Sequence, residues 1–251
     1  MTSVPLTPAQ ETAPLSEPER IVDTLVAPRR TFTDIRRNAA WWGPLLISAI
    51  ISLAFVYTVD LKVRFRKATE NQIDRSPKAS ARFEQMPPGE RNSALNTQAK
   101  ITRVISYGFP AVILIWNLVI AAILFATFKL GAGADLTFPA TFAVVMYAGL
   151  PLGLRSILVI ISLFAGFSPD SFTLQNPAAT NPGFFLDPTT SPFLYSLASA
   201  LDLFMIWTLI LTAIGFSCIS KKVKLFTALI GIFGWYAIFA LGSAALAAAF
   251  S

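Results

Sequence analysis

Five long apolar stretches make up about half of the chain and constrain its fold more than any other feature. They cover residues 41–59, 108–130, 138–165, 193–219 and 225–250. A helix needs roughly 20 mostly apolar residues to cross a bilayer. Lipid offers no partner for unpaired backbone N–H and C=O groups, so segments that cross it must be helices. The sequence therefore predicts an all-α fold, a polytopic membrane helical bundle with five transmembrane helices.

The composition limits the chemistry that such a bundle can carry. The chain has a net charge of +6, and most of its basic residues lie beside or between the apolar stretches. They lack the interleaved aromatic residues that indicate nucleic-acid binding. Histidine is absent and Cys218 is the single cysteine, so the commonest metal ligand is missing and no intrachain disulfide can form. No phosphate-binding loop occurs. We expect a protein that is not an enzyme and has no cofactor, metal or nucleic-acid partner.

The residues before the first apolar stretch predict a disordered tail followed by a segment at the membrane surface. Residues 1–18 hold four prolines and few bulky apolar groups, too few to bury a core. A short helix is expected to start at Thr31, because its hydroxyl can cap the helix and Asp34 follows three residues later. The segment has the character of an interfacial amphipathic helix bound to anionic lipid headgroups; a solvated linker is the alternative. The apolar side chains of Phe32 and Ile35 are expected to face the headgroup layer together. The residues expected at the lipid interface are Arg29, Arg30, Phe32, Arg36, Arg37, Trp41 and Trp42.

Two polar segments interrupt the membrane domain, which is expected to cover residues 19–251. Residues 60–106 carry ten basic and five acidic residues, with helical patterns on both sides of the sequence Pro-Pro-Gly. This pattern predicts a small helical hairpin whose second arm runs into the second span. Residues 166–192 contain five prolines, four phenylalanines and no Lys or Arg. We expect this segment to form an irregular loop against the membrane.

The distribution of basic residues predicts the orientation of the spans. Lys221, Lys222 and Lys224 lie in the short turn between the last two apolar stretches, and the positive-inside rule places this turn in the cytoplasm and residues 166–192 outside. Counting back along the chain puts the N-terminus inside and the C-terminus outside. Residues 60–106 would then be external despite their basic residues. If they are not, the first stretch is a re-entrant or interfacial hairpin and four spans remain.

Three polar side chains fall within the predicted spans. Charged side chains there are costly, by about 2.5–3.5 kcal/mol or more on insertion scales, so each is a candidate functional residue. Arg155 and Asp202 lie at a similar predicted depth, ~15 Å below the outer surface at a rise of ~1.5 Å per residue, and we expect them to pair. The pair either locks two helices together or forms a proton or substrate relay. Asn117 is expected to form a hydrogen bond between helices.

A short motif just before Arg155 adds a second feature to this candidate site. Gly149 and Gly153 are four residues apart, a spacing that lets another helix approach closely. Pro151 between them removes a backbone hydrogen bond and is expected to kink the span. The candidate intramembrane polar site therefore combines a kink, a close helix contact and a buried charge.

The order of features resembles the Yip family, membrane proteins named for interaction with Ypt/Rab GTPases, in its bacterial branch. The likeness rests on Ala27-Pro28-Arg29-Arg30-Thr31-Phe32-Thr33-Asp34-Ile35, on Trp41-Trp42-Gly43-Pro44, on Gln85-Met86-Pro87-Pro88 and on the segments 201–207 and 214–216. The resemblance covers residues 20–250 or so and implies five spans with a cytosolic N-terminus, in a bacterial inner membrane. The Rab partner does not carry over to a bacterial chain, so fold transfers better than function.

Two functions from different classes are compatible with these features. The first is a non-enzymatic integral membrane protein of the Yip type, a membrane-organising or partner-binding scaffold, with a second copy or another membrane protein as partner. The alternative is a small transporter or channel component that uses Arg155 and Asp202. A transporter is expected to show two similar halves or paired broken helices, and the sequence shows one clearly broken helix.

Overall fold

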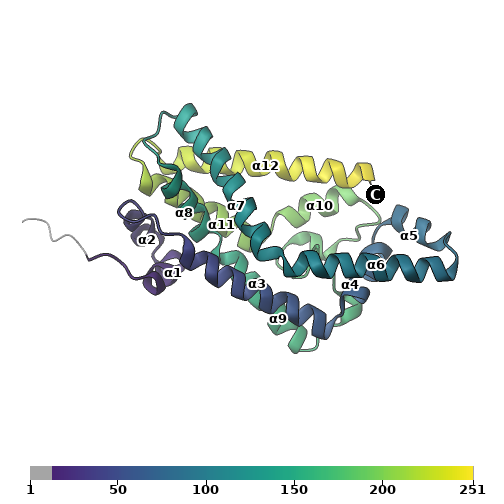
Figure 1. The fold of residues 1–251 in the computed structure, drawn as a ribbon. Coiled ribbons are helices and arrows are strands. Elements are labelled where there is room, and N and C mark those ends of the chain that lie inside the picture. The colour runs from purple at the N-terminus through teal and green to yellow at the C-terminus, as the bar shows by residue number, and fades with distance from the viewer. Residues whose placement is uncertain (1–12, 251) are drawn as a thin grey trace, which may run out of the picture.

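The structure, a computed structural model, describes residues 13–250, and every regular element in that part of the chain is a helix. The helices form an elongated bundle with an extension at one end (Figure 1). The prediction of an all-α polytopic bundle is confirmed. The helices of the bundle are α3 (Trp42–Lys62), α7 (Phe109–Ala126), α8 (Phe138–Ala148), α9 (Leu150–Phe164), α10 (Pro192–Ala200), α11 (Leu203–Ile219) and α12 (Leu225–Phe250).

The number of possible membrane crossings agrees with the five predicted spans when one bent pair of helices counts as a single span. By length and apolar composition, four helices can each cross a bilayer: α3, α12, the continuous pair α8 and α9, and α7 with its π-helical end Thr127–Gly131. The pair α10 and α11 passes the same test together but is bent by 49°. The fourth span is therefore broken, which its uninterrupted apolar pattern did not reveal.

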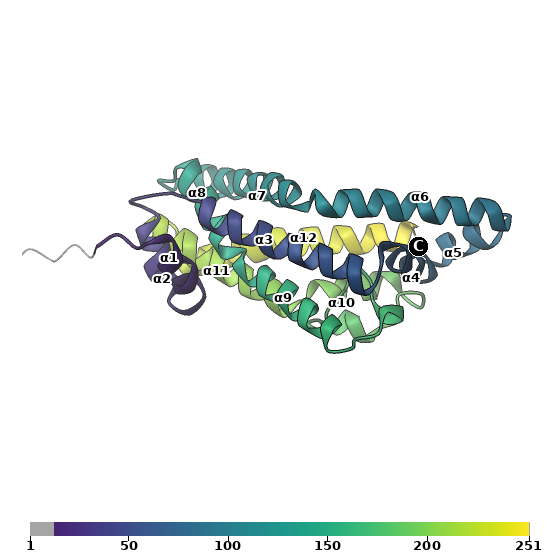
Figure 2. The ribbon, with the colours of Figure 1, turned by 60° about the horizontal axis from the view of Figure 1, so that its bottom comes forward.

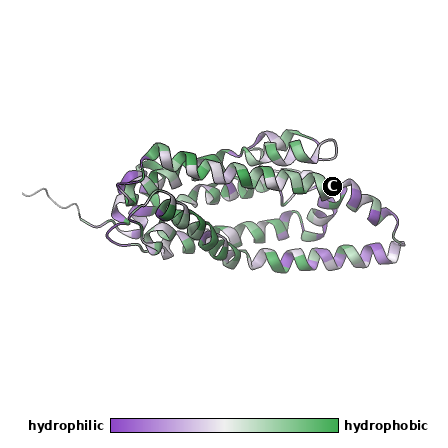
Figure 3. Cartoon of the chain, turned by 90° about the horizontal axis from the view of Figure 1, so that it is seen from above, coloured by the Kyte–Doolittle hydropathy of each residue, from purple (hydrophilic) through white to green (hydrophobic). Residues whose placement is uncertain are grey.

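The polar segment between the first two spans forms the extension, and it is helical as predicted. It contains α4 (Phe65–Asp74), α5 (Pro77–Glu84) and α6 (Pro88–Tyr107). Only Gly108 separates α6 from α7, and Figure 2 shows the two helices running end to end. Polar residues are concentrated in this extension, whereas the spans are mostly apolar (Figure 3). Helix α4 was not anticipated from the sequence.

The extension is held against other segments at its end of the bundle. Lys67 Nζ on α4 lies 2.7 Å from Asp170 Oδ1, in the loop that follows α9. The Asn71 side chain donates hydrogen bonds to two backbone carbonyls of the same loop, at 2.7 and 2.8 Å. On α5, Lys78 Nζ donates to the carbonyl of Ala249 at 3.1 Å. Residues 60–106, the loop 166–192 and the end of α12 therefore share one end.

Two short helices, α1 (Glu17–Val26) and α2 (Pro28–Asp34), cover the opposite end of the bundle (Figure 1). Helix α1 begins at Glu17, directly after Ser16, which forms a capping box with Glu19. Helix α2 begins at Pro28 rather than at Thr31, since proline is favoured in the first turn of a helix. Most of the predicted disordered tail, residues 1–12, lies outside the described residues.

The prediction that Phe32 and Ile35 face the lipid headgroups is wrong, because both side chains lie in the protein core. Phe32 is 0% and Ile35 is 1% exposed. Phe32 reaches the core at Gly215 of α11, where an added Cβ would lie 2.4 Å from Val144 and 3.3 Å from the Phe32 ring. Because this glycine has no side chain, α2 has room to pack here. Burial of Phe32 and Ile35 in the protein core is then more favourable than their placement at the membrane surface.

A buried polar network fixes these two helices to the bundle. The guanidinium of Arg20, which is 1% exposed, lies 2.7 Å from the Asp34 carboxylate. The hydroxyl of Tyr147 on α8 donates to Glu17 at 2.6 Å, and the Thr31 hydroxyl donates to the carbonyl of Arg20 at 3.0 Å instead of capping α2. Burial lowers the pKa of Arg20, but hydrogen bonding to Asp34 and Tyr147 outweighs this effect and the pKa is raised.

Candidate functional site

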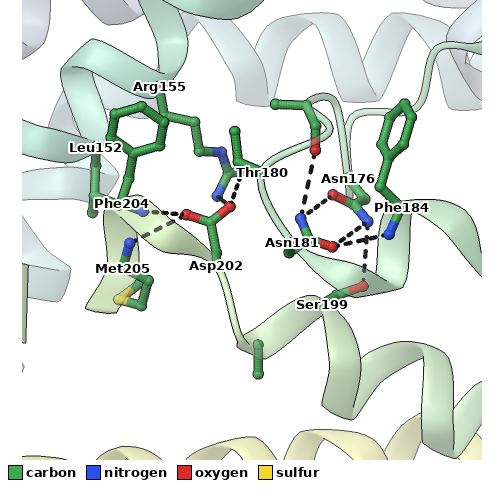
Figure 4. Close-up of polar contacts among 12 residues, drawn as sticks. Leu152, Arg155, Asn176, Thr180, Asn181, Phe184, Ser199, Asp202, Phe204 and Met205 are labelled. Carbon is green, nitrogen blue, oxygen red and sulfur yellow. Dashed lines mark hydrogen bonds and ion pairs between the residues drawn. The ribbon is translucent and has the colours of Figure 1, made fainter. Parts of the chain in front are cut away.

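The structure brings Arg155 of α9 and Asp202 together, as the sequence predicts. Arg155 Nη1 lies 3.6 Å from Asp202 Oδ2. The Asp202 side chain is 3% exposed, whereas that of Arg155 is 26% exposed. Figure 4 shows the guanidinium reaching the carboxylate from the neighbouring helix. The contact is an ion pair whose N–O distance exceeds that of a charge-assisted hydrogen bond, typically ~2.8 Å.

The surroundings of Asp202 differ from the prediction, which placed this residue within a continuous helix. Asp202 lies at the break between α10 and α11 and caps α11, since its Oδ1 accepts from the backbone N–H groups of Phe204 and Met205 at 3.0 and 3.2 Å. Its Oδ2 also accepts a short hydrogen bond from the Thr180 hydroxyl. Aspartate is among the best helix N-caps because its carboxylate satisfies backbone donors, and this preference stabilises the break.

An amide network holds the loop 166–192 beside this break (Figure 4). The side chains of Asn176 and Asn181 exchange hydrogen bonds at 3.1 and 2.8 Å. Asn176 also donates to the hydroxyl of Ser199 on α10 at 3.3 Å, and Asn181 accepts from the backbone of Phe184 at 3.0 Å. Both asparagines are buried. The predicted irregular loop is therefore an ordered cover over the end of the fourth span, and the sequence analysis missed these asparagines.

A cavity of about 570 Å³ lies beside Arg155. Pockets that bind small molecules have volumes of roughly 300–1,000 Å³ and a few polar groups in an apolar wall. The wall comes from α3, α6, α7, α8, α9, α11 and the loop 166–192. Of the predicted site residues, Asn117, Gly149, Gly153 and Arg155 line it, whereas Pro151 and Asp202 do not. The polar lining residues are Ser48, Ser52, Ser106, Asn117, Arg155 and Ser156.

The two glycines of the motif have different surroundings. An added Cβ at Gly153 would lie 3.2 Å from Ile51 of α3, so this glycine does permit the predicted close helix contact. At Gly149 the nearest atoms are carbonyl oxygens of α8, 3.5 Å away. Gly149 ends α8 and Pro151 lies in the first turn of α9. The two helices still form one 27-residue apolar unit, so the interruption is milder than the break before Asp202.

Asn117 connects two spans, as expected. Its side-chain amide on α7 donates to the sulfur of Met146 on α8 at 3.4 Å. Sulfur is a weak acceptor, so this hydrogen bond of the Asn117 amide is weak. Within the described residues, no group of three His, Cys, Asp or Glu side chains lies close enough together to hold a metal ion.

The predicted interface residues divide into exposed and buried groups. The side chains of Arg29, Arg30, Arg36 and Arg37 are exposed near the covered end of the bundle. Trp42 is 55% exposed, whereas Trp41 packs edge to face on Phe142 at a centroid distance of 5.1 Å. On α1, the apolar side chains of Val22 and Val26 are exposed, at 57% and 74%. The periodic apolar face of α1 could have indicated these two residues.

Comparison with known proteins identifies one relationship. A family model described as the Yip1 domain matches residues 22–246. This range includes the ion pair, the cavity lining and all of the spans except the last residues of α12. No curated protein and no solved structure matches the chain.

Proposed function

The chain belongs to the Yip1 domain family, and from this premise we propose that it is a non-enzymatic scaffold that organises the surrounding membrane and holds partner proteins in it. The observation that carries this proposal is the outer face of α1 and α2. There, the exposed side chains of Val22 and Val26 lie on the same small helical unit as the exposed Arg29 and Arg30. Apolar side chains next to basic ones match the boundary between acyl chains and anionic headgroups.

The attachment of this helical unit supports a scaffold role. The ion pair between Arg20 and Asp34 joins α1 to α2, and the hydrogen bond between Tyr147 and Glu17 connects this unit to the spans. A lipid or a protein that binds the outer face is therefore bound to a rigid body rather than to a flexible tail. Exposed Trp42, at the start of α3, suits the same membrane interface.

We further propose that this end of the bundle is cytoplasmic, in a bacterial inner membrane. The exposed arginines of α2 and the lysine turn at residues 221–224 lie at this end. The loop 166–192 at the other end has no basic residue. Under the positive-inside rule this asymmetry supports a cytoplasmic N-terminus and an external C-terminus.

Energy transfer to labelled lipids tests the scaffold proposal. The full chain is reconstituted in mixed vesicles that contain either an anionic or a zwitterionic dansyl lipid, and transfer from tryptophan is compared. We expect at least twofold stronger transfer to the anionic lipid. The double variant Arg29→Gln/Arg30→Gln is expected to lose most of this preference, while the control Arg82→Gln/Arg91→Gln in the extension retains it. Equal transfer to both lipids in the wild type would exclude lipid organisation by this face.

A transporter or channel component remains the second candidate. The cavity beside Arg155 favours it, together with two interrupted spans, at Gly149 and before Asp202. Paired broken helices around a site within the bilayer are typical of secondary transporters. Uptake of charged solutes into proteoliposomes, compared between wild type and a chain with a blocked cavity, separates this candidate from the scaffold.

A further inference from the structure

The wall of the cavity beside Arg155 contains a buried polar group that has no hydrogen-bond partner in the described part of the chain. Ser52 on α3 is 8% exposed and lines the cavity. Its hydroxyl has no hydrogen-bond partner within residues 13–250. Ser156, another serine of the lining, donates to the carbonyl of Leu152 in its own helix at 3.2 Å. A buried hydroxyl without a partner is destabilising, so a ligand that moves the side chains around Ser52 can supply the missing partner.

The guanidinium of Arg155 has donors that Asp202 does not satisfy. Arginine carries five N–H donors, and the contact with Asp202, at 3.6 Å, is longer than a hydrogen bond. Asp202 already accepts from the Thr180 hydroxyl and from two backbone N–H groups of α11. Since a membrane interior supplies few acceptors, the remaining donors favour an anion. Guanidinium groups bind carboxylates and phosphates through paired hydrogen bonds.

Apart from Arg155, Asn117 and the serines, the wall is apolar, and it reaches the surface of the bundle. Val112 and Trp116 of α7 line the cavity and are 44% and 51% exposed. This side of the cavity therefore lies where acyl chains surround the spans. A mostly apolar wall with one cation and the buried, unpaired hydroxyl of Ser52 suits a ligand that is itself apolar except at one end. The apolar lining residues of the first two spans are Ile51, Phe55, Val56, Phe109, Val112, Ile113 and Trp116.

We propose that this cavity binds an amphiphile from the bilayer through its anionic head, a carboxylate or a phosphate. The head contacts Arg155 and the hydroxyl of Ser52, while the acyl chain lies along the apolar wall formed by α3 and α7. Asp202 positions Arg155 from the side remote from the ligand. The site does not depend on the scaffold proposal, which concerns the outer face of α1 and α2.

Quenching of Trp116 provides a direct measurement of binding. The purified full chain in neutral detergent is titrated with doxyl-labelled stearate and, separately, with its uncharged methyl ester. A Trp116→Phe variant defines how much of the signal comes from the cavity. We expect the acid to saturate the Trp116 signal at a concentration at least tenfold lower than the ester, because only the acid carries the charge that matches Arg155.

Three variants and one control locate the site. Arg155→Gln is expected to reduce the preference for the acid to less than twofold. Ser52→Ala is expected to weaken acid binding several-fold, and Gly149→Leu to abolish saturable binding of both probes by filling the cavity. The control Gly234→Leu, at a position on α12 with no neighbouring atom within 4 Å of an added Cβ, leaves binding unchanged. If Arg155→Gln fails to fold, Ser52→Ala and Gly149→Leu still decide the question.

Competition experiments identify the source of the anion and distinguish the results that support the proposal from those that overturn it. Displacement of the stearate by phosphatidic acid, but not by inorganic phosphate at the same concentration, supports a lipidic ligand. Equal displacement by inorganic phosphate overturns the lipidic source. Equal binding of the acid and the ester, or binding that Gly149→Leu leaves intact, overturns the proposed site itself.

Discussion

The hydroxyl of Tyr147 on α8 donates a hydrogen bond to the carboxylate of Glu17 on α1, with an O–O distance of 2.6 Å. The two residues are 130 positions apart in the sequence, and Tyr147 is 0% exposed. This contact joins the N-terminal helices to the middle of the bundle. An added Cβ at Gly43 would lie 2.3 Å from the same carboxylate, so the start of α3 leaves room for Glu17.

Removing this hydroxyl should destabilise the N-terminal unit. Tyr147→Phe removes the donor to Glu17 Oε2 and leaves the half-buried carboxylate with only the longer Arg20 contact to Oε1, at 3.4 Å. A buried group that loses a partner costs about 1–3 kcal/mol. We expect a lower melting temperature in detergent and faster proteolysis between α2 and α3. The control Tyr57→Phe changes a side chain that is 61% exposed and should melt like the wild type. Equal proteolysis of Tyr147→Phe and the wild type would contradict the proposed attachment.

Truncation of Phe32 should act on the core rather than on lipid binding. Phe32→Ala removes a fully buried ring that packs beside Gly215 of α11, and such truncations cost about 3–5 kcal/mol. The matched control Val26→Ala shortens a side chain that is 74% exposed and should leave the unfolding midpoint nearly unchanged. A normal midpoint combined with weakened vesicle binding in Phe32→Ala would restore the interfacial placement predicted from the sequence.

The ion pair between Arg155 and Asp202 predicts that a single substitution lowers the folded yield more than a double substitution does. Arg155→Leu strands the Asp202 carboxylate, and breaking a buried pair costs about 3–5 kcal/mol. Because Asp202 also caps α11, Asp202→Leu should be worse than Asp202→Asn, which retains a capping oxygen. The double variant Arg155→Leu/Asp202→Asn should recover much of the folded yield that Arg155→Leu loses. Wild-type yield in both single variants would show that the contact is energetically neutral.

Surface labelling tests the proposed orientation. In a Cys218→Ser background, single cysteines replace Glu90, Thr189 and Lys221, whose side chains are all exposed. An impermeant reagent added to intact cells should label the cysteines at 90 and 189, which lie at the same end of the bundle, and leave the one at 221 unlabelled. Labelling at 189 with protection at 90 would support the four-span arrangement. Asn176 is unsuitable because it is buried in the amide network.

The sequence by itself determined the membrane bundle, the helical polar segment and the approach of Arg155 to Asp202. These features follow from the length of the apolar stretches and from depth along regular helices, which are local properties. The break before Asp202 was missed because α10 and α11 are both apolar, so no change in hydropathy marks the bend.

Tertiary structure alone decided which side chains of the N-terminal helices face the core. Phe32 and Ile35 were placed in the membrane interface because a sequence cannot distinguish an apolar face that meets lipid from one that meets protein. The choice depends on Gly215, Val144 and Tyr147, which meet the N-terminal helices only when α2 packs on α11 and α1 reaches α8. The cavity is likewise a product of the tertiary structure. Ser52 and Arg155 are about a hundred positions apart, and only the packing of α3 and α9 brings both to its wall.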